Sequence, residues 1–183
     1  MQAERNPDVG YDLASTIRNI PDFPKPGIQF KDVTTLLLVP EAFQAVIAYW
    51  EKRYDNTEVE CIVGVDARGF IFGAALAHTL GLPFVPARKK GKLPGEYFEE
   101  DFDLEYGTDT ITIHVDAIKA GTKAIIIDDL LATGGTVAAV HRILLRMEVH
   151  VLEAAFVIEL PPLNGRKKLD TLPVHSLVEF MVD

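Results

Sequence analysis

Stretches with helical and with strand-like spacing of apolar residues alternate along the chain. Phe43, Val46, Ile47 and Trp50 recur at helical spacing, which predicts an amphipathic helix with the tryptophan in the core. The continuous apolar run Ile125–Ile127 predicts a strand covered on both faces, which should stop where the following acidic residues begin. By the same criteria we expect helices at Asp12–Ile20, Pro40–Tyr54, Gly69–Leu80 and Val137–Arg146, and further strands at Cys61–Asp66, Phe84–Arg88, His150–Glu159 and Val174–Val178.

The order of these elements predicts the fold class. Strands that alternate with helices form a mostly parallel central sheet flanked by helices, so the chain should be an α/β protein. The acidic and aromatic stretch Glu96–Thr110 leads through a turn at Tyr106–Asp109 into the alternating residues Ile111–Val115, which predicts a β-hairpin. Its composition is more typical of a flexible lid than of a core. Pro21–Gly27 predicts an extended, ordered loop.

Composition narrows the class of protein. The 183 residues, of which 48% are hydrophobic, are enough for one domain with a sizeable core, which we expect to span residues 1–183. A formal net charge of −9 and a pI near 5.0 disfavour nucleic acid as a partner. No run reaches the roughly 18 apolar residues of a membrane span, so we expect no membrane partner and a cytoplasmic location. Cys61 lies in an apolar run and should pack in the core.

Two adjacent acids and a glycine-rich turn follow the run of isoleucines. Acids at the carboxyl end of a strand mark a ligand crevice. The turn Thr133–Thr136 has little side-chain bulk, and it can direct backbone N–H groups and the positive end of the next helix toward one anion. Asp128 and Asp129 would repel a phosphate unless they face sugar hydroxyls or a magnesium ion. This pattern favours a sugar phosphate such as ribose 5-phosphate.

A simpler interpretation is an ordinary strand, turn and helix, with Asp128 capping the helix. The two acids and two threonines around the glycines favour the phosphate site instead. A Walker loop is excluded because no GK[ST] ends the turn, and Gly69–Gly73 lacks the GxGxxG spacing of a dinucleotide site.

Two further segments favour a second anion. Asp66–Gly69 also joins a strand to a helix, and Arg68 adds a cation there. Taken alone, this segment is more typical of a surface arginine beside a turn, but together with the glycine-rich turn it favours an anion site. The basic run Arg88–Lys92 can attract pyrophosphate, or it is an ordinary solvated face. Because Gly91 and Gly95 suggest a mobile loop, we favour the first interpretation.

Glu105 in the predicted hairpin is a candidate acid or base once the lid closes over the site. Composition alone does not separate it from the other acids of the hairpin, which are Glu99, Glu100, Asp101 and Asp103. The five histidines show no spacing typical of metal ligands.

Four motifs, together with the turn that follows the two acids, resemble the type I phosphoribosyltransferase family, and within it the enzymes that use adenine. They occur in the family's order over nearly the whole chain, at Phe23–Asp32, Ala67–Phe70, Val85–Gly95 and Leu104–Gly107. The resemblance implies transfer of the ribose phosphate of phosphoribosyl pyrophosphate to N9 of adenine, which forms AMP and pyrophosphate. It also implies substrate-bound Mg²⁺ without direct protein ligands, and a homodimer. A transferase for xanthine, guanine or hypoxanthine, and a noncatalytic sensor of phosphoribosyl pyrophosphate, are the alternatives.

The resemblance also implies roles for individual residues. Within the single domain it assigns base binding to residues 1–35 and a basic loop with a hairpin lid to residues 89–115. The ribose and its 5′-phosphate would be held by Asp128, Asp129, Ala132, Thr133, Gly134, Gly135 and Thr136. Pyrophosphate would be held by Ala67, Arg68, Arg88, Lys89 and Lys92. Adenine would be recognised by Gln29, Phe30 and Lys31, and Glu105 would exchange a proton with the purine.

The chain departs from the family pattern at three places. Lys31 stands where arginine is usual, so bidentate or stacking contacts of that side chain are not expected. Asp66 replaces a glutamate and shortens that carboxylate. Met147–Glu153 lacks the glycines that commonly precede the last long strand.

Overall fold

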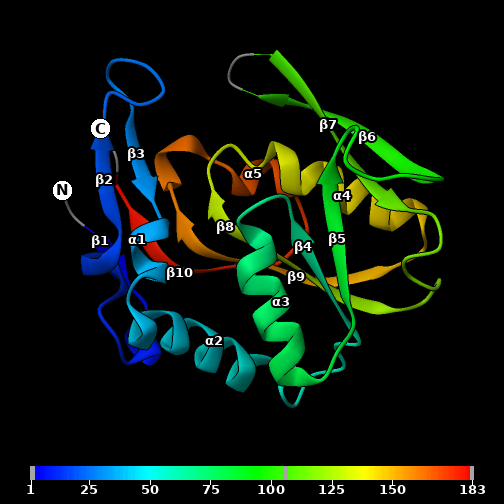
Figure 1. The fold of residues 1–183 in the computed structure, drawn as a ribbon, viewed down its shortest axis with the longest axis horizontal. Helices are drawn as coiled ribbons and strands as arrows, with labels where there is room; N and C mark the ends of the chain where they lie inside the picture. The colour runs from blue at the N-terminus through cyan, green and yellow to red at the C-terminus, as the bar shows by residue number, and fades with distance from the viewer. Residues whose placement is uncertain (1–2, 105–106, 182–183) are drawn as a thin grey trace.

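The computed structural model describes residues 3–104 and 107–181 and shows an α/β fold with a largely parallel sheet (Figure 1). Within these residues the main sheet has eight strands. In spatial order they are β1 (Ala3–Arg5), β10 (Val174–Phe180), β9 (His150–Glu159), β8 (Lys123–Leu131), β4 (Cys61–Val65), β5 (Phe84–Lys89), β7 (Gly107–His114) and β6 (Tyr97–Leu104). The strands from β10 to β5 are parallel, whereas β1, β7 and β6 pair antiparallel. This confirms the predicted fold class.

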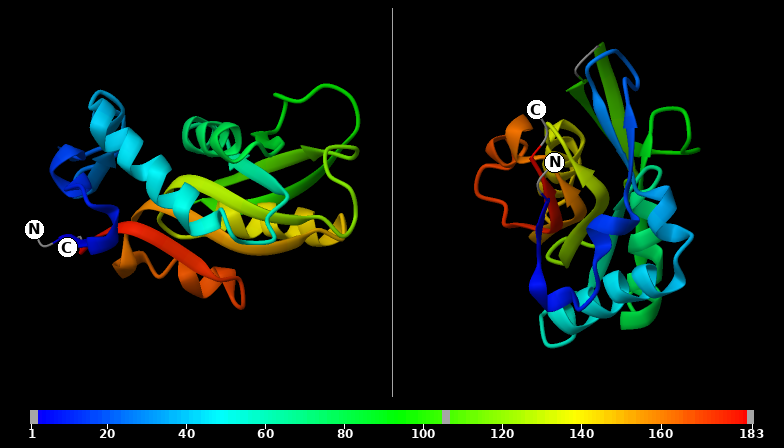
Figure 2. Two further views of the ribbon diagram at one scale, coloured as in Figure 1. Left: turned by 90° about the horizontal axis from the view of Figure 1, so that it is seen from below. Right: turned by 90° about the vertical axis from the view of Figure 1, so that its left-hand side faces the viewer.

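Helices cover both faces of the sheet (Figure 2). The helices are α1 (Thr34–Leu37), α2 (Pro40–Tyr54), α3 (Gly69–Leu80), α4 (Gly135–Arg146) and α5 (Arg166–Leu169), with 3-10 turns at Pro7–Val9, Leu13–Thr16 and Pro161–Leu163. Alternate residues of β8 point to opposite faces: Ile125 and Ile127 pack in the core beneath α2 and α3, and Ile126 packs in the core beneath α4. The sheet is therefore buried on both sides, as parallel sheets usually are.

The predictions that depend on local sequence patterns are confirmed for α2 and α3. Helix α2 has the predicted bounds and buries Trp50, and α3 ends at Gly81 in the left-handed conformation. Cys61 is buried, and burial raises the pKa of its thiol to about 11, in keeping with a packing role. No helix in residues 3–104 and 107–181 is long and apolar enough to cross a bilayer.

One predicted strand boundary and one predicted helix are wrong. Strand β8 does not stop at the acids but continues to Leu131, because its ladder with β9 extends to the pair Leu131 and Glu159. Residues 12–20 do not form a helix: after a 3-10 turn, β2 (Arg18–Pro21) pairs antiparallel with β3 (Gln29–Asp32). In both cases pairing with a partner strand outweighs the local pattern.

The predicted hairpin is present as β6 and β7, but part of it belongs to the core. Phe102, Ile111 and Ile113 are buried beneath α4, so the expectation of a lid rather than core is wrong for these positions. The expected turn at 106–109 is also displaced, since β7 already begins at Gly107. Pairing across the hairpin up to Leu104 and Gly107 accounts for this shift.

The turn before β9 forms without the glycine that the family commonly places there. Glu148 takes the left-handed conformation with φ 58°, and the N–H of Val149 bonds the carbonyl of Leu144 at 2.9 Å. A non-glycine residue therefore closes helix α4 at this point, at some conformational cost.

Candidate functional site

The carboxyl ends of β4, β5 and β8 meet at one edge of the sheet, next to a cavity of about 480 Å³. The cavity is lined by Val65, Asp66, Ala67, Arg68, Lys89, Phe102, Asp128, Asp129, Leu130 and Thr136. It is placed where parallel α/β sheets bind ligands, and it brings together residues that three separate sequence motifs identified. Phe102 and Leu130 were not foreseen, because their apolar character gave no chemical signal.

The two acids sit differently in this cavity. Asp129 is 5% exposed and forms an ion pair with Arg68. Asp128 is half-buried, and desolvation by burial raises the pKa of its carboxyl well above the usual range, with the neighbouring charge of Asp129 acting in the same direction. Burial would lower the pKa of Arg68, but the negative charge of Asp129 raises it. The arginine thus neutralises one acid of the pair.

The glycine-rich turn surrounds a second, smaller space beside the first. A cavity of about 150 Å³ is lined by Asp128, Leu130 and residues 131–137. Gly134 precedes helix α4 in the left-handed conformation with φ 76°, and no side chain caps the helix there. Asp128 therefore does not cap α4, contrary to the simpler interpretation, and the N–H groups of the first turn are free to meet an anion.

The segment after β4 approaches strand β8 closely. Ala67 and Arg68 line the large cavity, and helix α3 begins at Gly69. A Cβ atom on Gly69 would lie 2.6 Å from the carbonyl oxygen of Ile127, so only glycine allows this helix to start against β8. The structure thus brings Arg68 to the acids through a close contact between α3 and β8.

The basic run is distributed over two environments. Lys89 lines the cavity, and its Nζ lies 2.9 Å from a carboxylate oxygen of Asp109. Arg88 Nε lies 3.3 Å from the carboxylate of Asp66, and Lys92 is exposed. Neither Arg88 nor Lys92 lines the large cavity in this chain.

The predicted base-binding residues lie on β3. Phe30 is half-buried and meets the ring of Phe23 edge to face at a centroid distance of 5.2 Å. Lys31 is only 2% exposed: its Nζ donates to Asn19 Oδ1 at 2.9 Å and lies 4.7 Å from the centre of the Phe180 ring. Burial lowers the pKa of Lys31. None of the three predicted residues, Gln29, Phe30 and Lys31, lines the large cavity.

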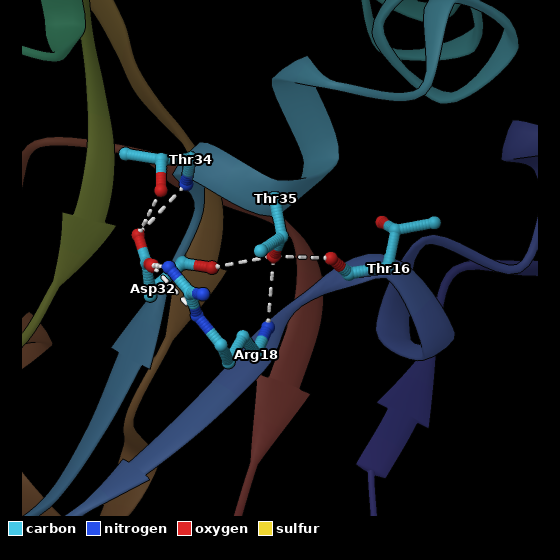
Figure 3. A network of polar contacts seen from close by, with 5 residues as sticks. All are labelled: Thr16, Arg18, Asp32, Thr34 and Thr35. Atoms are coloured by element: carbon cyan, nitrogen blue, oxygen red, sulfur yellow. Dashed lines mark hydrogen bonds and ion pairs between the residues drawn. The ribbon is translucent and has the colours of Figure 1, made fainter.

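A polar network that the sequence did not reveal holds this hairpin to the rest of the chain (Figure 3). Arg18 on β2 donates to Asp32 from Nε at 3.1 Å and from Nη2 at 2.5 Å. The N–H and hydroxyl of Thr34 donate to the other oxygen of Asp32, and the Thr35 hydroxyl donates to the carbonyl of Thr16 at 2.6 Å. The register of β2 on β3, which pairs Arg18 with Asp32, was the missing signal.

This network predicts a specific pH dependence of stability. Burial alone would raise the pKa of Asp32, but the bonds from Thr34 and Arg18 outweigh it and lower the pKa from 3.8 to about 2. A carboxyl with a depressed pKa stabilises the folded state above its unfolded pKa and loses that contribution as the pH falls through the folded pKa. The stability difference between the unmodified chain and Asp32→Asn should therefore be constant above about pH 5 and shrink between about pH 4 and pH 2.

Urea unfolding of both proteins at a series of pH values measures this difference. The same substitution at the exposed Asp116 is the matched control and should not remove this part of the pH dependence. A difference that stays constant down to pH 2 contradicts the assigned role of Arg18 and Thr34.

Glu105, the predicted catalytic residue, lies outside the described residues, directly after the last residue of β6 in the sequence. Strand β6, which precedes Glu105, forms ion pairs with α4. Arg142 Nε lies 2.6 Å from a carboxylate oxygen of Glu100, and Arg146 lies 3.2 Å from the other. The base of the hairpin is thus joined to the same helix that begins at the glycine-rich turn.

Comparisons with known proteins identify the family of this chain. A family model for the phosphoribosyl transferase domain matches residues 32–179. The adenine phosphoribosyltransferase of Chloroflexus aurantiacus is 53% identical over 92% of this chain and 98% of its own length, and that of Trichlorobacter lovleyi is 54% identical over 92% and 99%.

Solved structures show the same similarity. The crystal structure of adenine phosphoribosyltransferase from Thermoanaerobacter pseudethanolicus superposes with a TM-score of 0.88 at 46% identity, covering 92% of this chain and 98% of that one. The Saccharomyces cerevisiae enzyme, complexed with an imino-altritol bisphosphate and adenine, gives a TM-score of 0.87 at 40% identity, covering 94% and 99%. Sequence and fold are therefore similar over nearly the whole chain.

Proposed function

We propose a residue-by-residue mechanism from the premise that this chain belongs to the phosphoribosyltransferase family, among the enzymes that use adenine. It transfers the 5-phosphoribosyl group of phosphoribosyl pyrophosphate to adenine and forms AMP and pyrophosphate, a reaction of purine salvage. The observation that carries the mechanism is the meeting of Arg68, Asp129 and the turn 132–136 at one edge of the sheet. A polyanion at one end and a phosphate at the other can both be bound there.

One end of the site would hold the 5′-phosphate and the ribose. Backbone N–H groups of Ala132–Thr136, the hydroxyls of Thr133 and Thr136, and the first turn of α4 offer donors around the 150 Å³ cavity. The carboxylates of Asp128 and Asp129 would accept from the ribose hydroxyls. As positive charge develops on the ring during transfer, nearby carboxylates stabilise the transition state more than the substrate.

The other end would hold pyrophosphate. Ala67, Arg68 and Lys89 line the cavity there and would receive the leaving group. Release of the Arg68 guanidinium from Asp129 toward the incoming polyanion would also free that carboxylate for the ribose. Arg88 and Lys92, which do not line the cavity of their own chain, would serve the site of a second subunit in a homodimer.

The residues around the cavity would hold magnesium through the substrate and not as direct ligands. Among the described residues no three carboxylates or histidines gather to hold a metal, whereas Mg²⁺ commonly keeps its waters and binds phosphate oxygens. When bound, the ion would neutralise charge on the departing pyrophosphate. The guanidinium of Arg68 and the ammonium of Lys89, two cations that line the cavity, would share the charge of the pyrophosphate.

Adenine would be read by the β2–β3 hairpin. Phe30 would stack on the base, and backbone groups of Gln29 and Lys31 would bond its edge. The side chain of Lys31 is bound to Asn19 and Phe180, so it would orient the strand rather than contact the base. Glu105 would hold or accept the proton of the purine when the base is bound. A cytoplasmic location stays a prediction from the sequence.

A direct assay tests the activity. Phosphoribosyl pyrophosphate and Mg²⁺ are supplied with adenine, hypoxanthine, guanine or xanthine in separate reactions, and the nucleotide is identified by chromatography. AMP from adenine is the expected product, with the other bases at least about a hundredfold slower, because unpaired polar groups in a base site are costly. Formation of IMP, GMP or xanthosine monophosphate alone would place the chain with the other purine transferases, and no nucleotide at all would remove the enzymatic assignment.

A further inference from the structure

The segment between β9 and β10 lies directly against the glycine-rich turn (Figure 1). A Cβ atom on Gly165 would lie 2.3 Å from the carbonyl oxygen of Ala132. A Cβ atom on Gly134 would lie 2.4 Å from the carbonyl oxygen of Gly165. Both distances are far shorter than any ordinary contact, so the two backbones touch because neither residue has a side chain.

Gly165 needs to be glycine for close packing and not for its torsion angles, since a Cβ atom there would also lie 2.9 Å from Cδ1 and 3.0 Å from Cγ of Leu131. Its backbone is helical, with φ −56° and ψ −36°, a conformation that alanine adopts readily. Gly134, with φ 76°, would in addition be strained by any side chain. Gly165 is therefore the cleaner probe, because substitution there changes the fit against Ala132 and the preceding Leu131 and not the local torsion angles.

An ion pair next to Gly165 fastens the segment to the sheet. Arg166 donates to Glu159 from Nε at 2.7 Å and from Nη2 at 2.6 Å, and from Nη1 to the carbonyl of Val174 at 3.0 Å. Glu159, at the end of β9, is 3% exposed and pairs in register with Leu131 of β8. One guanidinium thus ties the segment to β9 and β10, directly beneath the turn that follows Leu131.

We propose that Gly165, held by the Arg166–Glu159 pair, is a positioning residue that sets the place of the turn 132–136 and so its affinity for the 5′-phosphate. The proposal rests on the proposed function, which assigns that phosphate to this turn. Residues 132–136 contain no lysine or arginine, so the turn binds through N–H and hydroxyl groups whose alignment decides their strength. A displacement of the Ala132 carbonyl by an added methyl group misaligns these donors.

The test compares ligands that occupy opposite ends of the site. Ribose 5-phosphate probes the turn, and inorganic pyrophosphate with Mg²⁺ probes the other end, both by calorimetric titration. For Gly165→Ala we expect the Kd for ribose 5-phosphate and the KM for phosphoribosyl pyrophosphate to rise about tenfold to a hundredfold. The Kd for pyrophosphate should stay within about twofold, since its binding residues do not touch Gly165.

Two further variants keep the test decisive. Arg166→Lys retains the charge but loses the bidentate contact with Glu159. It should again raise the Kd for ribose 5-phosphate more than that for pyrophosphate, by a smaller factor, and it provides a test even where Gly165→Ala fails to fold. Gly73→Ala is the matched control. It adds the same methyl group on α3, against the ring of Phe84 on β5, and should change the binding of neither ligand.

Different failures have different signatures. Unchanged ribose 5-phosphate binding in both variants, or an equal loss of both ligands, overturns the positioning role. Thr136→Val separates that outcome from failure of the proposed function, because it removes a donor of the turn itself. If Thr136→Val also leaves ribose 5-phosphate binding intact, the phosphate does not bind in this turn. That result would contradict the proposed phosphate site rather than the positioning role of Gly165.

Discussion

Asp129→Asn is expected to lower the turnover of AMP formation by about a hundredfold to a thousandfold. Asparagine keeps the shape of the side chain but removes the charge that stabilises the cationic ribose. It also releases Arg68, whose guanidinium pairs with this carboxylate. Because the effect arises mainly in the transition state, kcat should fall while the KM for phosphoribosyl pyrophosphate changes much less.

Steady-state kinetics with saturating adenine measures this prediction. Asp116→Asn, at an exposed position away from the cavity, removes the same charge and should leave kcat within about twofold. Thermal unfolding of the three proteins shows whether a change in fold accounts for lost activity. A normal kcat in Asp129→Asn would mean that this acid has no part in stabilising the transferred sugar.

Glu105→Gln is expected to slow the chemical step by about a hundredfold or more while phosphoribosyl pyrophosphate still binds. Glutamine can donate and accept hydrogen bonds but cannot exchange a proton with the purine. The expected fall in rate therefore concerns the step at adenine and leaves the pyrophosphate end unaffected. Single-turnover kinetics is the appropriate measurement, because product release can otherwise hide a change in chemistry.

Glu99→Gln is the matched control for this position. Glu99 lies on the same hairpin, but its carboxylate pairs with Lys90, 3.1 Å away, and it does not line the cavity. Its substitution should leave the single-turnover rate nearly unchanged. An unaltered rate in Glu105→Gln would remove this residue from catalysis and direct attention to another acid of the hairpin.

Much of the fold followed from local patterns. Helix α2 and the end of α3 at Gly81 were predicted because apolar spacing and a left-handed glycine act within a few residues of one another. The predicted end of strand β8 is wrong because pairing with β9 decides where β8 ends. The predicted helix at residues 12–20 is wrong because residues 18–21 pair with β3 instead. The hairpin was found, but burial of Ile111 and Phe102 beneath α4 was not.

By itself, the sequence determined the α/β class and the kinds of chemical groups available: adjacent carboxylates, a turn without bulky side chains and a set of cations. Only the tertiary structure decided which of these groups meet. It paired Arg68 with Asp129, raised the pKa of Asp128 by burying it, and set Gly165 against Gly134. The physical reason is that spacing and propensity act along the chain, whereas contacts, desolvation and close backbone approach depend on the register and packing of strands distant in sequence.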